Sequence, residues 1–264
     1  MTASIPPGPG GGPAFPSGRH RPAPPALVLV AHGSRDPRAL TTVRALAARV
    51  RRLRPGLAVR LGHIELNEPL LPATLAALGD TPAVLVPLLL ARGHHVKRDI
   101  PELAAAARVR ARVAAPLGPH PLLAETLHAR LLEAGWPAAP GDTARRSTAV
   151  VLAAAGSRDP DSAADTRRTA RLLADRLGVP VVPAYASAAT PAVPTALRAL
   201  AARGRHRVAV ASCFTAPGRF AAQCAAASPW LASAPLGAHE AMARLVLHRY
   251  EQTQRAREPQ PASA

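Results

Sequence analysis

The segment AHGSRD at residues 31–36 carries a histidine in a setting that could support chemistry, and a second copy of the segment lacks it. The second copy, AAGSRD at residues 154–159, has alanine in place of His32. Each copy follows an apolar run and precedes a proline and a stretch with helical apolar spacing. Both are therefore predicted to lie at strand-to-helix turns. A neutral imidazole binds divalent metals and exchanges protons near pH 7, so His32 is a candidate for either role.

The duplication extends over both halves of the chain. Matching segments recur in the same order at offsets of 122 to 125 residues: Gly33 and Gly156, residues 69–72 and 191–194, and residues 91–93 and 216–218. This regularity predicts two related half-domains. The first half keeps polar groups that the second has replaced, namely His32 by Ala155, Glu65 by Ser187, His95 by Phe220 and Asp99 by Cys224. A structural role would be expected in both halves, so the retained set is interpreted as chemical, with drift of surface residues as the alternative.

Apolar, β-branched runs alternate with longer amphipathic stretches, which is typical of βα units on a parallel sheet. The first half predicts strands near 26–31, 58–64, 82–90 and 111–114, and helices near 37–54, 69–79, 99–108 and 120–134. The second half predicts strands near 148–154, 180–185 and 206–213, and helices near 160–177, 191–203, 217–227 and 238–252. The expected fold class is α/β, with two similar doubly wound lobes, each a mainly four-stranded parallel sheet flanked by helices.

Composition divides the chain into five parts. Residues 1–24 are rich in Pro and Gly and are predicted to be disordered. Two lobes follow, and the segment between them combines Gly, Pro and polar residues without a clear period, as a linker does. The expected boundaries are 25–134 for the lobe with the candidate site, 135–147 for the linker, 148–252 for the degenerate repeat and 253–264 for a polar tail.

The predicted topology brings the candidate residues to one rim. His32 ends the first strand and His95 lies just beyond the third. In a sheet of order 2-1-3-4 these strands are neighbours, and the chain reverses direction between them, at the kind of switch point where ligands bind. His63 and Glu65 end the second strand, on the other flank. Two imidazoles and a carboxylate from separate strand ends could hold a metal and leave positions open, as catalytic sites do.

These residues carry a resemblance to a known family. Residues 31–35 after the first strand, Glu65 after the second, and GHHVKRDIP at residues 93–101 after the third resemble the sirohydrochlorin chelatases, in their cobaltochelatase and ferrochelatase branches. The resemblance covers roughly residues 26–250. It implies an enzyme that inserts Fe²⁺ or Co²⁺ into the tetrapyrrole sirohydrochlorin, in sirohaem or cobalamin biosynthesis, with the substrate in a cleft between two α/β lobes.

Carried over residue by residue, the resemblance implies that His32 and His95 bind the metal and accept pyrrole protons, and that Glu65 is a third ligand. The motif H-x-x-x-D-I-P selects His95 and leaves His94 as an exposed loop residue. His63 is either an extra ligand or a polar rim residue. The sequence does not select among iron, cobalt and nickel, because histidine and glutamate accept all three.

Five further residues are expected to bind the substrate. Gly33 would permit close approach of the backbone, and hydrogen bonds or ion pairs to substrate carboxylates would come from Ser34, Arg35, Lys97 and Arg98.

Structural roles remain open for several of these positions. Gly33 and Ser34 could simply form the turn, as their counterparts would in the second half. Asp36 and Asp159, each before a proline, are typical helix caps. Asp99 either caps a helix or orients His95.

The composition bounds partners and location. The formal net charge is +17, but the basic residues are scattered, nearly all are arginine, and only 3% of residues are aromatic, so we expect a solvated surface and no nucleic-acid partner. The charge would still attract a polyanionic small molecule. No apolar run could span a bilayer and no secretory leader is evident, so a cytoplasmic protein is expected.

The two cysteines, Cys213 and Cys224, are expected to be reduced thiols near the second core. The tail lacks cysteine and histidine, so no iron–sulfur cluster and no cofactor beyond the substrate metal is expected. Two fused lobes would not require an oligomer.

Three other functions compete with chelation. A non-catalytic carrier of a tetrapyrrole or metal would use the same rim. A nucleic-acid binder would depend on net charge. A hydrolase built on Ser34 is disfavoured because no G-x-S-x-G motif is present.

Overall fold

The first half of the chain forms a four-stranded parallel sheet with the predicted order. The structure, a computed structural model, describes residues 23–138 and 141–256. The strands pair in the order β2-β1-β3-β4, with bounds β1 (Ala26–Ala31), β2 (Val59–His63), β3 (Ala83–Pro87) and β4 (Ala111–Val113). β1 lies in the interior of the sheet, and all six of its residues are buried. Residues 1–22 of the predicted disordered segment and residues 257–264 of the predicted tail lie outside the described residues.

The second half repeats this arrangement with one strand fewer. Its parallel sheet has the order β6-β5-β7, with β5 (Thr148–Ala154), β6 (Val181–Tyr185) and β7 (Arg207–Ser212). Where a fourth strand would lie, Ala232 forms a single parallel bridge to Val210. Prolines at 229 and 235 flank this segment and lack the N–H groups that would extend the pairing. The expectation of mainly four strands therefore holds for the first sheet only.

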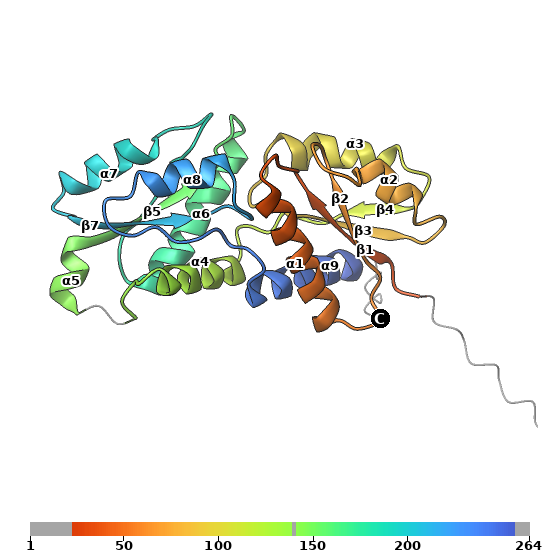
Figure 1. Ribbon diagram of the computed structural model, residues 1–264, viewed down its shortest axis with the longest axis horizontal. Helices are drawn as coiled ribbons and strands as arrows, with labels where there is room; N and C mark the ends of the chain where they lie inside the picture. The colour runs from red at the N-terminus through yellow and green to blue at the C-terminus, as the bar shows by residue number, and fades with distance from the viewer. Residues whose placement is uncertain (1–22, 139–140, 257–264) are drawn as a thin grey trace, which may run out of the picture.

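Helices cover both faces of each sheet (Figure 1). In the first half they are α1 (Pro37–Leu53), α2 (Leu71–Ala76) and α3 (Ile100–Ala105), and in the second α6 (Pro160–Leu177), α7 (Val193–Ala201) and α8 (Arg219–Ala226). The side chains of Asp36 and Asp159 accept the backbone N–H groups of Arg38 and Asp161, which confirms both as helix caps. Two segments were not foreseen: a π-helical turn, η1 (His95–Asp99), precedes α3, and α5 (Asp142–Ser147) lies within the predicted linker.

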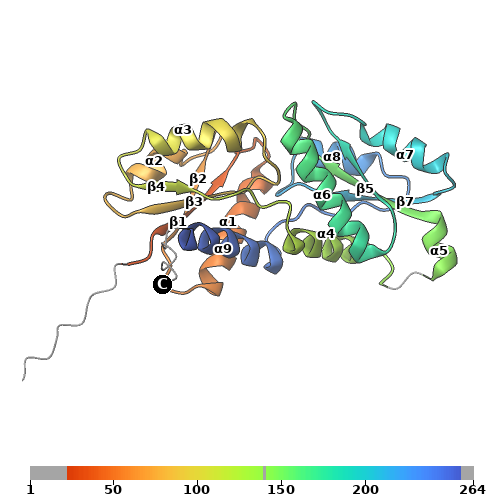
Figure 2. The ribbon, with the colours of Figure 1, turned by 180° about the vertical axis from the view of Figure 1, so that it is seen from behind.

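The two halves exchange their last helices. α4 (Pro121–Glu133) belongs to the first half by sequence but packs mainly on α6 of the second. α9 (Glu240–Arg255) ends the second half but packs on α1 and β3 of the first. Figures 1 and 2 show α4 beneath the second sheet and α9 beneath the first, and the two helices also contact each other. Each lobe in space therefore combines a sheet from one half of the sequence with a helix from the other.

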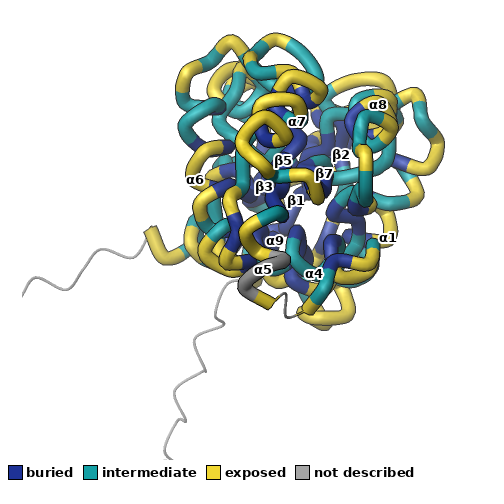
Figure 3. Tube along the Cα trace, turned by 90° about the vertical axis from the view of Figure 1, so that its left-hand side faces the viewer, coloured by how far each residue is buried: buried dark blue, intermediate teal, exposed yellow. Residues whose placement is uncertain are grey.

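The buried core follows from this exchange. Strands β1, β3 and β5 are buried along their whole length, while the outer helices expose their outward faces (Figure 3). One apolar cluster runs from Leu27 of β1 through Leu127 of α4 and Val246 of α9 to Val150 of β5, so both lobes share a continuous core. None of the described helices combines the length and apolar character needed to cross a membrane.

A buried ion pair joins the lobes beside the predicted site. Asp165 of α6 is 1% exposed, and it accepts hydrogen bonds from the Arg92 backbone N–H at 3.0 Å and from its guanidinium at 2.9 and 2.8 Å. The Arg92 side chain is 39% exposed. Lys97 contacts Asp159 at 2.7 Å and Asp161 at 2.8 Å. Residues on both sides of His95 are thus held by the start of α6.

A histidine caps α4 at the contact with α9. Nδ1 of His120 accepts the Leu122 N–H at 3.1 Å, and the ring lies 4.6 Å, centroid to centroid, from that of His248 on α9. Burial, followed by the charges of His248 and Arg249, lowers the pKa of His120 from 6.5 to about 4. Between pH 6.5 and about pH 4, His120 is therefore mostly neutral in the folded protein and mostly protonated in the unfolded chain.

We expect the two partners of the buried pair to respond unequally to substitution. Arg92→Met leaves a buried carboxylate with only a backbone N–H, and should lower the free energy of unfolding by about 3 kcal/mol. Asp165→Asn leaves a guanidinium that water can reach, and should cost about 1 kcal/mol. Urea unfolding of both single variants and the double variant measures this, and the double variant should be more stable than Arg92→Met alone. An equal loss in the two single variants would contradict the argument.

The stability contributed by neutral His120 should be present above pH 6.5 and be lost as the pH falls from 6.5 towards 4, because only the unfolded chain then gains the proton. Asparagine caps helices well and does not titrate, so His120→Asn is the matched variant. Urea unfolding should show that the free energy of unfolding falls more between pH 8 and pH 5 for the wild type than for His120→Asn. Equal losses would exclude His120 as the source.

Candidate functional site

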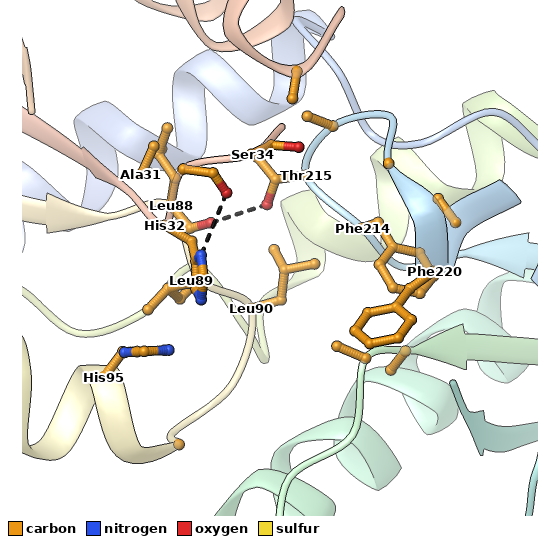
Figure 4. Close-up of a pocket in the computed structure, with 18 of the residues that line it drawn as sticks. Ala31, His32, Ser34, Leu88, Leu89, Leu90, His95, Phe214, Thr215 and Phe220 are labelled. Atoms are coloured by element: carbon orange, nitrogen blue, oxygen red, sulfur yellow. Dashed lines mark hydrogen bonds between the residues drawn. The ribbon is translucent and has the colours of Figure 1, made fainter. Parts of the chain in front are cut away.

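A large cavity lies between the lobes at the carboxyl ends of their strands. Its volume is about 1170 Å³. The first lobe lines it with the segments after β1 and β3, and the second lobe with the segments after β5 and β7. This volume slightly exceeds the usual range for small-molecule sites, which is roughly 300–1,000 Å³. Figure 4 shows the histidines of the first lobe facing aromatic rings of the second across this space.

The structure brings His32 and His95 together on one wall of this cavity. Their ring centroids are 4.6 Å apart and the ring planes are nearly perpendicular, at 88°. His32 follows β1, and His95 begins the π-helical turn η1 after β3. The two strands pair directly, with Val30 opposite Pro87, so the loops that follow them emerge side by side. Single π-helical turns are frequent at functional sites.

A carboxylate lies next to Nδ1 of each imidazole. Nδ1 of His95 donates to Asp99, and Nδ1 of His32 lies 3.5 Å from a carboxylate oxygen of Glu65 and 3.3 Å from the Gly33 carbonyl. Asp99 makes no capping hydrogen bond to α3, so of its two expected roles the structure supports the orienting one. A partner on Nδ1 fixes the ring and leaves Nε2 as the free nitrogen on each histidine.

Glu65 is close to His32 but is not placed as a third member of a ligand cluster. It does not line the cavity, and its side chain is 53% exposed. Within the residues that the structure describes, no group of three or more His, Cys, Asp or Glu side chains could hold a metal ion. The structure thus gathers the two imidazoles, and ligation by all three residues stays a prediction.

The glycine and serine of the repeated motif make the same turn in both halves. Gly33 has φ +105°, and a Cβ there would lie 1.8 Å from the Glu65 carbonyl oxygen. Gly156 has the same relation to Ser187. The hydroxyls of Ser34 and Ser157 each accept a backbone N–H two residues ahead, at 3.1 Å. These contacts support the structural interpretation, although Gly33 and Ser34 also line the cavity.

The three expected carboxylate-binding cations lie in different places. Arg35 lines the cavity with an exposed side chain and has no ion pair to any described residue. Lys97 and Arg98 are exposed and do not line it. The hydrogen bonds to Asp159 and Asp161 that occupy the Lys97 ammonium also raise its pKa. The structure therefore brings only Arg35 of the three to the cavity.

His63 and His94 are placed very differently. His63 is 1% exposed, its Nδ1 lies 3.2 Å from the Pro69 carbonyl, and its Nε2 has no partner among the described residues. It lines the cavity, and burial lowers its pKa. The His94 side chain is 76% exposed, as expected, with Nε2 3.3 Å from Asp99.

The second lobe contributes residues that the sequence did not single out for the site. Phe214, Thr215 and Phe220 line the cavity, and the Thr215 hydroxyl donates to the Leu88 carbonyl of the first lobe at 2.9 Å. The repeat offset marks Phe220 only as the replacement of a histidine, and no motif signals that its ring faces the cavity. Cys213 and Cys224 are buried free thiols, as expected, and burial raises the pKa of Cys213 to about 12.

A family model and several curated proteins match this chain. The CbiX family model matches residues 26–134 and again residues 149–253. The sirohydrochlorin cobaltochelatase of Methanococcus aeolicus is 40% identical over 81 residues, which are 30% of this chain and 57% of that protein. The sirohydrochlorin ferrochelatase of Bacillus subtilis is 31% identical over 175 residues, 63% of this chain and 64% of that protein. These matches span less than two thirds of either curated relative.

Solved structures extend the likeness to the whole fold. SirB from Bacillus subtilis with Fe³⁺ has a TM-score of 0.69 and 25% identity, and the likeness covers 87% of this chain and 95% of that one. The family model matches both halves separately, in agreement with the internal repeat. The chain therefore belongs to the CbiX family.

Proposed function

We propose that this protein inserts Fe²⁺ or Co²⁺ into sirohydrochlorin, with His32 and His95 as the residues that hold the ion and accept protons. The observation that carries the proposal is the pair of imidazoles, 4.6 Å apart, on the wall of a cavity of about 1170 Å³ between the lobes. The names of the relatives support the substrate, since they are sirohydrochlorin chelatases for cobalt and for iron.

The chemistry requires two changes at the metal and the ring. Two pyrrole N–H protons leave, and ring nitrogens replace the water or imidazole ligands of the ion. Two neutral imidazoles hold a divalent ion more weakly than a closed four-ligand site would, which favours its release into the macrocycle. Once the ion has left, the same Nε2 atoms can accept the pyrrole protons as general bases.

The carboxylates behind the histidines would support both roles. Asp99 and Glu65 fix the tautomer, and each would stabilise the imidazolium that forms when its histidine takes a proton. In this arrangement Glu65 acts on His32 rather than on the metal. Arg35 and the Ser34 hydroxyl, which line the cavity, would bind substrate carboxylates, and the net charge of +17 would attract such a polyanion.

His32→Ala and His95→Ala should each lower the rate of metal insertion by at least about 100-fold, because each removes a base and a metal-binding nitrogen. His94→Ala is the matched control, since this exposed neighbour should retain nearly the full rate. The assay follows the absorption change of sirohydrochlorin with Co²⁺ or Fe²⁺ against a protein-free sample. A wild-type rate equal to the rate of the protein-free sample would exclude catalysis and favour a non-catalytic carrier. Near-normal rates in either histidine variant would exclude the roles assigned to His32 and His95.

The roles of the two carboxylates can be separated by substitutions that keep their shape. Asp99→Asn and Glu65→Gln should each lower metal insertion by roughly 10- to 100-fold, because an amide supports the imidazole less well than a carboxylate. Both variants should keep most of the Co²⁺ affinity measured by titration without tetrapyrrole. A loss of affinity in Glu65→Gln as large as in His32→Ala would identify Glu65 as a direct ligand.

A further inference from the structure

The cavity wall opposite the histidines presents aromatic rings. Phe214 and Phe220 come from the second lobe, and Figure 4 shows both rings across the cavity from His32 and His95. Phe214 packs against the core of the second lobe, whereas Phe220 belongs to no core cluster of the described residues. Phe220 is half-buried and lines the cavity.

A cation lies against the same ring. The Arg219 guanidinium carbon is 4.9 Å from the centroid of Phe220, within the range of a cation–π contact. Arg219 lines the cavity, is exposed, and has no ion pair to any described residue. Its N–H groups therefore stay available to a carboxylate in the cavity.

An aromatic ring in a cavity wall beside a guanidinium without an ion pair has a clear chemical preference. Aromatic faces bind flat conjugated systems by offset stacking, and guanidinium groups bind carboxylates in pairs of hydrogen bonds. A ligand that satisfies both is flat, conjugated and carries carboxylates at its edge. Phe220 and the imidazoles lie on opposite sides of the same cavity of about 1170 Å³ (Figure 4), and such a macrocycle would occupy the space between them.

We infer that Phe220 and Arg219 form a binding subsite for a flat polycarboxylate macrocycle. Phe220 contacts one face of the macrocycle, Arg219 binds one carboxylate at its edge, and the histidines face its opposite side. The identity of the macrocycle as sirohydrochlorin rests on the proposed function. The stacked ring would exclude water from the far face and hold the macrocycle so that metal arrives from the histidine side only. Phe220 therefore acts on substrate binding, separately from the metal-binding pair.

Substitutions at Phe220 test the subsite. The measurement is the affinity for metal-free sirohydrochlorin, determined by fluorescence titration. Phe220→Leu keeps an apolar side chain but removes the flat face, and should weaken binding by about tenfold. Phe220→Tyr keeps the face and should bind within about twofold of the wild type. Arg219→Ala should weaken binding several-fold and reduce its dependence on salt. Co²⁺ affinity without tetrapyrrole should be unchanged in all three.

Trp230→Leu is the matched control, because Trp230 also carries an arginine over its ring, Arg207 at 4.5 Å, but lies outside the cavity. It should bind sirohydrochlorin like the wild type. If the wild type metallates the ring while Phe220→Leu binds it unchanged, the subsite is overturned and the proposed reaction stands. If the wild type binds the ring through Phe220 but inserts no metal, the reaction is overturned and the subsite stands. No binding by the wild type would overturn both.

Discussion

The direct pairing of β1 with β3 is the constraint on which the candidate site depends. Because parallel strands present their carboxyl ends at the same edge, the loops after β1 and β3 must emerge together, and these loops carry His32 and His95. β2 pairs on the other side of β1 and brings Glu65 to His32. At Gly33 the chain then passes too close to the Glu65 carbonyl for any side chain. The geometry of the site therefore follows from strand order before any metal or substrate is considered.

The sequence predicted the parts of this arrangement that depend on local pattern. The duplicated motif, the first sheet's strand order, the capping by Asp36 and Asp159 and the convergence of His32 with His95 all follow from spacing that the residues themselves encode. The exchange of α4 and α9 could not be predicted in the same way. An amphipathic pattern shows that a helix has an apolar face, but both lobes offer a sheet that such a face could cover.

Contacts between residues that are far apart in the sequence also could not be predicted from it. Lys97 was a reasonable partner for a substrate carboxylate, but two aspartates of α6 occupy its ammonium in the folded chain. The missing strand of the second sheet depends on two prolines that flank a short segment, and the π-helical turn at His95 has no distinct periodicity over five residues. The degenerate lobe is more than a remnant: it supplies the acidic residues that hold both sides of the His95 segment and the aromatic wall facing it.

The exchanged helices have a consequence for how such a protein can be divided. The last helix of each half-sequence packs on the other half's elements, so each lobe is built from both halves of the sequence. A cut in the connecting segment would separate α9 from the β3 face that it covers, and α4 from α6. Because both exchanged contacts lie within one chain, the connection between the halves keeps the shared core in a single molecule.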